Sequence, residues 1–547
     1  SSRLGTHLAR PRSRCAQFVP QQRKMAAQGA AAVALASAAA EAAMGPPHGS
    51  KSLLAFVQSP QLPRTRQGLR GVGLEPPAPS PDAAAGAPGV TACLGLGGLA
   101  VVGALRAERR ARRRSDAFPS LGRGGRQRLA ATAVDTAVAT ASSGASEAVR
   151  KLDEYVKERG GSRVLRRIMI ANNGMAATKA ILSMRQWAYL EFGEESLFEF
   201  VAMATRDDLD ANAEFIRLAD MFVEVPSGKN VNNYANVDLI CSVAKAQSVD
   251  AVWPGWGHAS ENPDLPMKLK EIGITFIGPP SPVMSVLGDK IAANILAQTA
   301  GVPSIPWSGD GLTASLTPEG TIPDEVFRKG TVTSVDEAVE CAERIGFPVM
   351  VKASEGGGGK GIRMCASRAE IEANFPQVQN EAPPGSPIFV MQLCQGARHI
   401  EVQIVGDEHG QAVALNGRDC STQRRFQKIF EEGPPAIVPK DTFVEMERAA
   451  QRLTKSIGYV GAGTVEYLFN AETNTFYFLE LNPRLQVEHP VTEELTQVNL
   501  PATQLQVCMG IPLDKVPQIR SFYGKAASDA DSPIDFLQDA YVYPTRH

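Results

Sequence analysis

The sequence contains 547 residues, of which 44% are apolar and 21% charged, so it is long enough for two to four domains with a large buried core. Its 56 basic and 58 acidic side chains give a net charge of −2, which argues against nucleic acid or an anionic membrane as a partner. Any anion must therefore be bound by local groups. The eight cysteines lack the close pairs of a zinc site or a disulfide framework and are interpreted as reduced thiols.

Residues 1–150 differ in composition from the rest of the chain. Ala, Gly, Pro, Ser and Arg dominate them, so they cannot bury enough apolar surface to offset their ordering entropy, and we expect a low-complexity, disordered segment. Its two apolar stretches, residues 30–43 and 90–105, are too short to span a membrane. The Arg-rich run at 106–114 after the second stretch indicates a targeting segment for the plastid. The alternative is a low-complexity tail that carries no targeting signal, on a cytoplasmic protein.

A globular pattern begins at Arg163. Residues 164–170 read as a strand, 171–174 as a turn, and 175–190 as a helix with apolar residues at helical spacing. Further strand and helix candidates alternate at 199–203, 209–218, 221–225, 237–247, 250–253, 267–272 and 275–277. This alternation predicts a parallel, doubly wound α/β sheet. Beyond Gly278 the order becomes mixed, with hairpins, and predicts a second, α+β architecture.

A glycine run follows an apolar strand at residues 348–361. Gly356, Gly357, Gly358 and Gly359 leave backbone N–H groups open to an anion, and Lys352 and Lys360 flank them. The pattern favours a phosphate cradle, although it lacks the P-loop spacing. The alternative is a flexible linker.

Two acidic residues flank a turn-rich segment at residues 470–474. A hairpin folded about Thr473 sets Glu466 opposite Glu480 on neighbouring strands. Opposed carboxylates repel each other unless a cation lies between them, and oxygen ligands of this kind suit Mg²⁺. The hairpin therefore predicts a metal site.

Polar residues occupy every second position after Glu480. Asn482, Arg484, Gln486 and Glu488 follow it and alternate with apolar side chains. In an extended chain all five polar side chains share one face, which would hold metal ligands, a guanidinium and a carboxylate together. The alternative is an edge strand with a solvated polar face.

A third segment alternates in the same way at residues 398–404 and is followed by a basic stretch at 417–428. Its cations Arg424, Arg425 and Lys428 could hold phosphate or bicarbonate. The alternative is a solvated surface turn.

Together these segments resemble biotin carboxylases from Arg163 onward. The motifs appear in the family's order at 170–174, 253–262, 288–290, 352–361, 418–421 and 480–493. The sequences at 200–205, 224–226 and 232–238 resemble the biotin carboxylases that form the N-terminal part of eukaryotic multidomain acetyl-CoA carboxylases. The resemblance implies a Rossmann-like N-terminal domain at 160–283 and an ATP-grasp domain at 284–500, with a glycine-rich lid at about 350–415. Residues 501–547 would begin a truncated C-terminal domain.

The activity that this resemblance implies is ATP-dependent carboxylation of biotin with bicarbonate, through carboxyphosphate. It is the first half-reaction of acetyl-CoA carboxylase, which leads to malonyl-CoA for fatty acid synthesis. On matching positions, ATP would be bound by Lys290, Lys352, Gly356, Gly357, Gly358, Gly359, Met391, Gln392, Leu393, Cys394, His399, Gln423, Glu466 and Glu480. Mg²⁺ or Mn²⁺ would be bound by Glu466, Glu480 and Asn482. Bicarbonate would be bound by Lys428, Arg484, Gln486 and the backbone of Val487, with Glu488 as its base.

Two departures and two alternatives accompany the resemblance. Phe426 stands where the family usually has His, and the chain ends at His547 before an expected family arginine. No biotin-attachment Met-Lys-Met motif appears, so we expect the biotin carrier and carboxyltransferase domains outside this chain, and a homo-oligomer. The alternatives are another ATP-grasp ligase, of the pyruvate or propionyl-CoA carboxylase or carbamoyl phosphate synthetase type, and a catalytically impaired nucleotide-binding module.

Overall fold

The computed structural model describes residues 147–354, 361–425, 427–529 and 531–542, which all belong to one compact unit. Almost all of the expected low-complexity segment therefore lies outside the described residues, as do glycines 356–359 of the predicted phosphate cradle and Phe426. Within the described part, none of the helices has the length and apolar character needed to cross a membrane.

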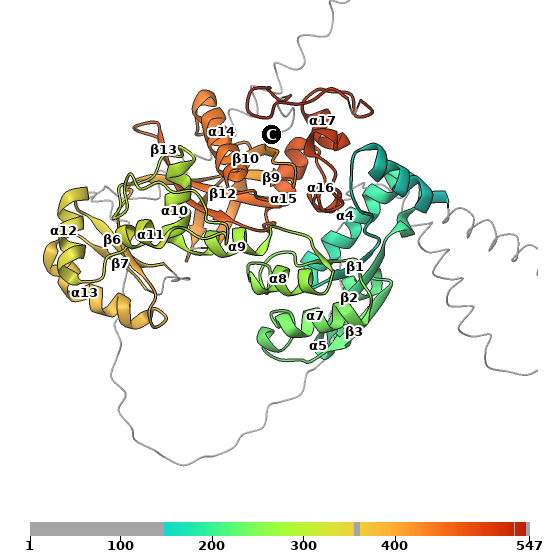
Figure 1. The fold of residues 1–547 in the computed structure, drawn as a ribbon, viewed down its shortest axis with the longest axis horizontal. Helices are drawn as coiled ribbons and strands as arrows, with labels where there is room; N and C mark the ends of the chain where they lie inside the picture. The colour runs from blue at the N-terminus through green and yellow to red at the C-terminus, as the bar shows by residue number, and fades with distance from the viewer. Residues whose placement is uncertain (1–146, 355–360, 426, 530, 543–547) are drawn as a thin grey trace, which may run out of the picture. The chain divides into compact units, whose positions relative to one another are not determined.

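A parallel five-stranded sheet forms the first part of the fold, in the order β3-β2-β1-β4-β5 (Figure 1). Its strands are β1 (Arg167–Ile170), β2 (Glu199–Thr205), β3 (Met221–Val225), β4 (Ala251–Trp253) and β5 (Thr275–Phe276). The connecting helices are α4 (Gly174–Phe192), η1 (Glu195–Leu197), α5 (Arg206–Asp210), α6 (Glu214–Leu218), η2 (Asn230–Asn232), α7 (Val237–Ala246) and α8 (Asp264–Glu271). This strand order is that of a doubly wound fold, so the predicted Rossmann-like domain is confirmed.

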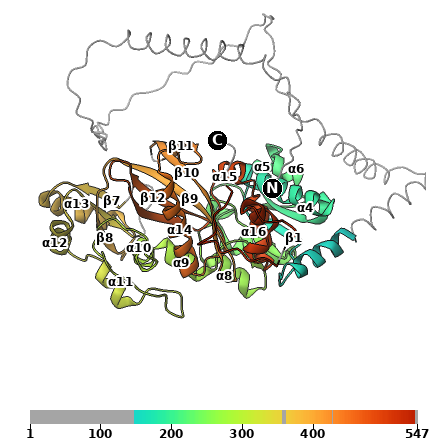
Figure 2. The same cartoon turned by 90° about the horizontal axis from the view of Figure 1, so that it is seen from above.

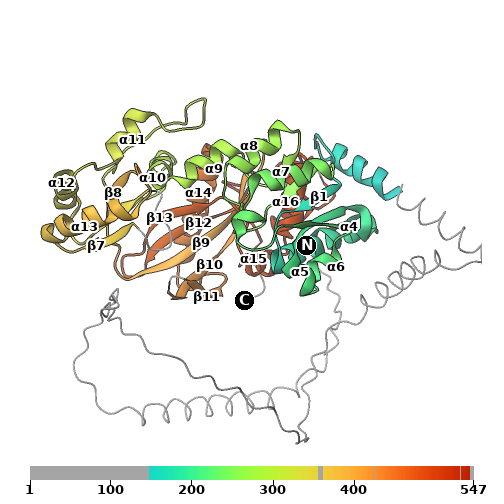
Figure 3. The ribbon, with the colours of Figure 1, turned by 90° about the horizontal axis from the view of Figure 1, so that it is seen from below.

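Alternate residues of β1 explain why helices cover both faces of this sheet. Ile168 and Ile170 belong to one hydrophobic core together with Ile181 of α4. Met169 belongs to a second core with Ile240 of α7 and residues of α8. Figure 3 shows α7 and α8 lying together. Strands buried on both faces are typical of a parallel sheet, which explains the nearly continuous apolar runs in the sequence.

One predicted helix is interrupted. The segment 209–218, expected as a single element, forms the end of α5 and then α6, because Asn212 takes a left-handed conformation with φ 50° between them. Asn tolerates this conformation better than most residues and so ends helices.

A three-stranded antiparallel sheet, in the order β7-β6-β8, forms a separate layer with two helices (Figure 1). Its elements are α12 (Val335–Ile345), β6 (Val349–Ala353), β7 (Ile362–Cys365), α13 (Arg368–Glu381) and β8 (Ile388–Gln392). The expected lid range of about 350–415 covers the strands of this layer but not α12, and it also takes in residues of another sheet. The alternating residues at 397–406 form a long strand that pairs outside the three-stranded sheet.

The third sheet is antiparallel, has five strands in the order β11-β10-β9-β12-β13, and carries the candidate site. Its strands are β9 (Ala397–Gly406), β10 (Ala412–Arg424), β11 (Gln427–Glu432), β12 (Gly461–Asn470) and β13 (Thr475–Asn482). Near it in sequence are α9 (Ser281–Gly288), α10 (Lys290–Thr299), α11 (Asp324–Gly330) and α14 (Lys440–Ser456). Residues of α10 and α14 pack in one core with apolar residues of β9 and β12 (Figure 2). On the opposite face, polar side chains surround Glu401 and Glu466, whereas one end of the face is apolar and belongs to another hydrophobic core through Val405, Val413, Leu415 and Ala462.

The C-terminal segment packs against the parallel-sheet domain. It contains α15 (His489–Thr496), α16 (Leu500–Cys508), η3 (Leu513–Lys515) and α17 (Pro517–Phe522). Leu505 and Ile519 lie in the same hydrophobic core as Ile168 of β1. The described residues beyond 500 therefore help to build the N-terminal domain's core.

Candidate active site

Three carboxylates lie side by side across the five-stranded antiparallel sheet. Glu466 on β12 pairs with Glu401 on β9 and with Glu480 on β13. Their neighbours Ile400 and Val465 belong to the hydrophobic core on the opposite face, as the alternation of a strand requires. Buried carboxylates this close repel each other unless cations lie among them.

The pairing of Glu466 with Glu480 depends on a β-bulge at Leu479. From the hairpin turn up to Tyr467 the two strands keep one register, which then shifts by one residue before Glu466. An extra residue in one strand reverses the face on which the following side chains lie. The predicted pair is present, but the bulge produces it, because the hairpin is not centred on Thr473.

Lys428 places its ammonium group among three carboxylates. Its Nζ donates to Glu401 Oε2 at 2.5 Å, to Glu488 Oε1 at 2.6 Å and to Glu466 Oε1 at 3.0 Å. Burial alone would lower the pKa of Lys428, but these carboxylates outweigh burial and raise it. Lys428 is therefore charged and links β9, β12 and the segment that begins α15.

Glu466 uses both of its carboxylate oxygens. Oε1 accepts from Lys428, from Asn482 Nδ2 at 3.0 Å and from Gln486 Nε2 at 3.1 Å. Oε2 lies 3.0 Å from His399 Nε2. Although burial raises the pKa of Glu466, His399 and Lys428 outweigh it and hold this pKa below its usual value. Glu466 is therefore an ionised, multiply bonded anion.

The pKa of Glu480 is shifted in the opposite direction to that of Glu466. Burial, and then the neighbouring Glu466, raise the pKa of Glu480, while Lys290 opposes this rise. Lys290 begins α10, and its Nζ donates to the backbone oxygen of Ser354 at 3.1 Å. A buried carboxylate with a raised pKa beside an ionised one is a place where a divalent cation would relieve repulsion.

Lys352 on β6 lies within electrostatic range of Lys290 and Glu480. Burial, and then the charge of Lys290, lower the pKa of Lys352 to about 8, and Glu480 opposes this effect. Its Nζ lies 5.9 Å from the ring centroid of Phe389 and 3.7 Å from Met391 Sδ. The structure therefore brings Lys290, Lys352 and Glu480 together, although they come from three separate segments.

The predicted hinge, residues 391–394, begins within β8 of the three-stranded sheet and continues two residues beyond its end. The Gln392 amide donates to Pro306 O at 2.8 Å, and the Leu393 amide donates to Pro348 O at 2.9 Å. Cys394 is partly buried. These bonds fix the backbone between the two antiparallel sheets, where a nucleotide base is expected.

His399 and Gln423 are neighbours, as their shared expected role requires. Gln423 Nε2 lies 3.2 Å from His399 Nδ1 and donates to Cys420 O at 2.9 Å. The opposite ring nitrogen of His399 faces Glu466. The two residues therefore extend the polar face of the sheet toward β10.

The segment after Asn482 does not continue as an extended strand, which corrects the prediction of one shared face for alternate residues. β13 ends at Asn482, and the chain then bends and turns before α15. Gln486 and Glu488 nevertheless reach Glu466 and Lys428, because the bends bring them back. The side chain of Val487 is exposed, at 59%.

Arg484 leaves this cluster and pairs with Glu261 of the parallel-sheet domain. Its Nη1 also donates to Leu485 O at 3.4 Å. Glu261 contributes to the raised pKa of Glu480, so the ion pair lies within electrostatic range of the paired carboxylates. Arg484 therefore borders the carboxylate cluster from the side of the other domain.

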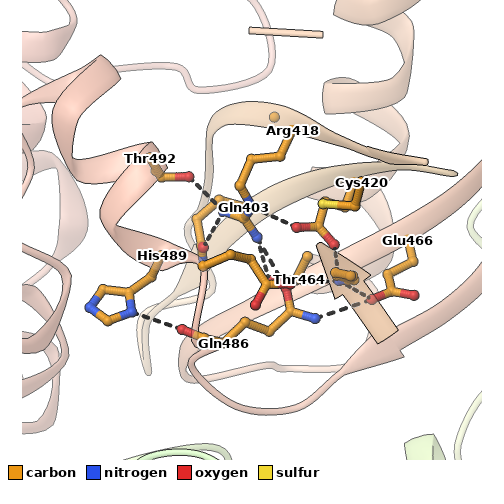
Figure 4. Close-up of polar contacts among 12 residues, drawn as sticks. Gln403, Arg418, Cys420, Thr464, Glu466, Gln486, His489 and Thr492 are labelled. Carbon is orange, nitrogen blue, oxygen red and sulfur yellow. Dashed lines mark hydrogen bonds and ion pairs between the residues drawn. The ribbon is translucent and has the colours of Figure 1, made fainter. Parts of the chain in front are cut away.

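Arg418 is a functional candidate that sequence reasoning missed (Figure 4). Its guanidinium is fully buried, and its Nε donates to Glu401 Oε1 at 2.5 Å. A bulge in β10 at Asn416, whose φ is 63°, sets Arg418 opposite Glu401 in the register. The alternation of polar and apolar residues around Glu401 could have indicated a polar face from the sequence. That Arg418 pairs with Glu401 could be seen only in the structure.

The donor set fits a divalent cation. Glu466 and Glu480 offer hard oxygen ligands, and Asn482 adds an amide next to them. His399, Glu401 and Glu466 form another group whose ligand atoms lie within 4.8 Å of one another, but Lys428 bonds both of its carboxylates. In the first set Lys428 bonds Glu466 but not Glu480, so the first set is the better site.

Family models match both halves of the fold. The family described as "Biotin carboxylase, N-terminal domain" matches residues 164–284, and the one described as "Carbamoyl-phosphate synthase L chain, ATP binding domain" matches 322–516. Together they define a protein in which a biotin carboxylase N-terminal domain precedes an ATP-binding domain.

Solved structures and curated relatives narrow this class. Biotin carboxylase from Campylobacter jejuni, solved as a beta-gamma-ATP complex, is 31% identical with a TM-score of 0.56, over 64% of this chain and 72% of that one. The biotin carboxylase domain of Hydrogenobacter thermophilus 2-oxoglutarate carboxylase, solved with MgADP, ADP and bicarbonate, is 31% identical with a TM-score of 0.55, over 64% of this chain and 70% of that one. The chain belongs to the biotin carboxylase family.

Within this family its sequence is homologous to the biotin carboxylase part of eukaryotic acetyl-CoA carboxylases. It is 59% identical over 389 residues to acetyl-CoA carboxylase of Dictyostelium discoideum, covering 70% of this chain and 17% of that protein. The acetyl-CoA carboxylase of Saccharomyces cerevisiae is 55% identical over 398 residues, covering 71% of this chain and 18% of that protein. The chain thus spans less than a fifth of the length of these relatives.

Proposed function

We propose that this chain catalyses the ATP-dependent carboxylation of biotin with bicarbonate. The observation that carries the proposal is the position of Lys428, whose Nζ bonds both Glu488 and Glu466. An anion-binding ammonium thus lies between a candidate base and a candidate metal ligand. The Campylobacter and Hydrogenobacter proteins, solved with a nucleotide and in one case with bicarbonate, support the same assignment.

The proposed binding groups fall into three sets. ATP is held by Lys290, Lys352, the glycine run at 356–359, the hinge at 391–394, His399 and Gln423, with Glu466 and Glu480 near its phosphates. Mg²⁺, or Mn²⁺, is held by Glu466, Glu480 and Asn482. Bicarbonate is held by Lys428, Arg484, Gln486 and the backbone of Val487.

The proposed mechanism begins with proton removal by Glu488. As bicarbonate gives up its proton to this carboxylate, one of its oxygens bonds to the γ-phosphorus of ATP, the bond to the β-phosphate oxygen breaks, and ADP leaves. Lys428 and Arg484 hold the negative charge of the nucleophile during this step. A divalent cation held by Glu466, Glu480 and Asn482 would neutralise charge on the phosphates. The carboxyphosphate formed then breaks its carbon–oxygen bond to give CO₂ and phosphate; the phosphate takes the proton of the biotin ureido nitrogen, and this nitrogen bonds to the carbon of CO₂.

The wider context is also proposed. The carried biotin and the carboxyltransferase that makes malonyl-CoA for fatty acid synthesis belong to domains outside this chain. The chain works as a homo-oligomer in the plastid, to which the segment at residues 1–150 directs it. Fusion of this segment to a fluorescent protein tests the location, and a diffuse cytoplasmic signal would contradict it.

The reaction is tested by phosphate release from ATP in the presence of free biotin, with and without bicarbonate. Bicarbonate should stimulate release, and Arg484→Ala should abolish the stimulation while ATP still binds. Arg206→Ala, which removes a surface arginine paired with Asp210, serves as a control. ATP binding without any stimulation would favour an impaired nucleotide-binding module. Stimulation that required ammonia would favour a carbamoyl phosphate synthetase.

A further inference from the structure

Arg418 satisfies every one of its five N–H groups without reaching solvent. Its exposed fraction is 0%. Besides the bond from Nε to Glu401, Nη1 donates to Gln403 Oε1 at 3.0 Å and to Thr492 Oγ1 at 2.6 Å. Nη2 donates to Gln486 Oε1 at 3.0 Å and to Thr464 Oγ1 at 3.4 Å. No donor is left over for a substrate.

The acceptors come from four different segments. They lie on β9, on β12, on α15 and in the bent segment that follows β13 (Figure 4). Because the guanidinium of Arg418 is planar and rigid, its bonds to four segments fix their relative positions more firmly than single bonds would.

One of these bonds sets the orientation of an amide that faces the site. Because Gln486 Oε1 accepts from Arg418, its Nε2 must point the other way, and it donates to Glu466 Oε1 at 3.1 Å. Without the guanidinium the amide could rotate and present its oxygen to Glu466, which would be repulsive. Arg418 therefore determines which end of Gln486 faces the carboxylates.

A second bond of Arg418 engages one of the two carboxylate oxygens of Glu401 and leaves the other for Lys428. Its Oε1 accepts from Arg418, and its Oε2 accepts from Lys428 at 2.5 Å. Arg418 balances the buried charge of Glu401, so Lys428 can also remain bonded to Glu488 at 2.6 Å. If Arg418 were lost, the unbalanced Glu401 would draw Lys428 away from Glu488.

We propose that Arg418 is a positioning residue for the bicarbonate subsite. It touches no substrate, but it orients Gln486 and, through Glu401, holds Lys428 against Glu488. This inference rests on the proposed function, since it assigns bicarbonate to Lys428 and Gln486.

The test compares Arg418→Lys with wild type by steady-state ATP cleavage. The KM for bicarbonate should rise by about tenfold, in line with the loss of bonds between charged groups, while the KM for MgATP stays within about twofold. A general loss of packing would change both constants or only the amount of folded protein. Equal shifts of both KM values, or an unchanged KM for bicarbonate, would overturn the inference.

Arg520→Lys is the matched control. Arg520 is also 0% exposed, and among the described residues its guanidinium bonds only to groups at residues 514, 526, 529 and 532, away from the carboxylates. This variant should lower the melting temperature without raising the KM for bicarbonate. A rise equal to that of Arg418→Lys would show that any loss of a buried arginine has this effect, and would overturn the inference.

A double-mutant cycle tests whether Arg418 acts through Gln486. In a Gln486→Ala background, Arg418→Lys should raise the KM for bicarbonate by much less than in wild type, whereas additive effects would contradict the mechanism.

Should Arg418→Lys fail to fold, Thr492→Val removes one bond to Arg418 and should shift the same KM in the same direction; no shift would overturn the inference. A wild-type protein without bicarbonate-dependent cleavage would overturn the proposed function and the inference with it, whereas an active wild type with unchanged variants overturns the inference alone.

Discussion

The guanidinium of Arg484 is paired with the carboxylate of Glu261, which lies 223 positions earlier in the chain and belongs to the other domain. Arg484 is the group assigned to bicarbonate, so the partner that it has in this structure is itself an anion. A substrate oxyanion and Glu261 would therefore compete for one guanidinium.

We expect Glu261→Gln to lower the KM for bicarbonate. Removing the competing charge frees Arg484, and because partly exposed ion pairs contribute about 0.2–1 kcal/mol, the decrease should be at most about fivefold. Initial rates of ATP cleavage at constant ionic strength measure it. If the KM instead rises, Glu261 orients Arg484 and does not compete for it. Glu271→Gln, which changes an exposed carboxylate of α8, is the control.

Glu480→Gln should raise the Mg²⁺ requirement by about tenfold or more, the usual cost of weakening a metal site. The amide keeps the shape of the side chain but removes one of the two opposed charges. Titration of ATP cleavage with Mg²⁺ at saturating ATP gives the shift. Glu472→Gln, in the exposed turn of the same hairpin, should leave the titration unchanged. An unshifted curve for Glu480→Gln would remove this residue from the metal site.

Glu447 on α14 should make stability depend on pH. Both of its oxygens accept from Tyr541 Oη at 2.9 Å, and burial raises the pKa of Glu447 to about 8 from its usual 4.5, although Tyr541 opposes the rise. Between these two values the folded state holds a proton that the unfolded state has lost. The free energy of unfolding should therefore fall as pH rises from about 4.5 to about 8, and change little from this group above that.

Glu447→Gln tests this dependence. The amide can still accept from Tyr541 but does not ionise, so the loss of melting temperature between pH 5 and pH 8 should shrink. Glu445→Gln alters a carboxylate on the same helix that pairs at the surface with Arg452, and should keep the wild-type slope. An equal slope in wild type and Glu447→Gln would show that Glu447 is ionised in the folded state.

Gly417→Ala should destabilise the fold. A Cβ at this position would lie 2.4 Å from Glu401 O and 2.7 Å from the ring of Phe443, so β9 and β10 would have to separate. Overpacking of this kind costs about 1–3 kcal/mol, measurable by denaturant unfolding. At Gly288 a Cβ would meet nothing within 4 Å, so Gly288→Ala should be close to neutral. Equal stability of the two variants would contradict the close approach.

Much of the fold could be predicted from the sequence because its strands and helices have clear periods. The strand Met221–Val225 coincides with the predicted one, and the parallel order follows from the alternation of elements. The alternation at 397–404 indicates a strand but does not show that this strand pairs with β12, so the sequence alone could not assign it to a sheet.

The candidate site was less accessible to sequence reasoning. The pairing of Glu466 with Glu480 was predicted correctly, but the residue type of Leu479 does not indicate the bulge on which the pairing depends. Arg484 was expected beside Glu488 because an extended chain was assumed, whereas the bend after Asn482 depends on the packing of α15 against the sheet. Bonds between distant segments, such as that of Arg418 to Thr492, follow from tertiary structure alone.

The bulge at Leu479 separates the tip of the hairpin from the pair of carboxylates that it carries. Loops of other lengths could be grafted between Asn470 and Thr475 without moving that pair, provided that the ladder beyond them survives. Deletion of Leu479 itself would remove the extra residue and leave a regular ladder in which Glu480 still pairs with Glu466 and Phe478 and Leu481 still face the core. The hairpin therefore tolerates changes of length at its turn and at the bulge itself.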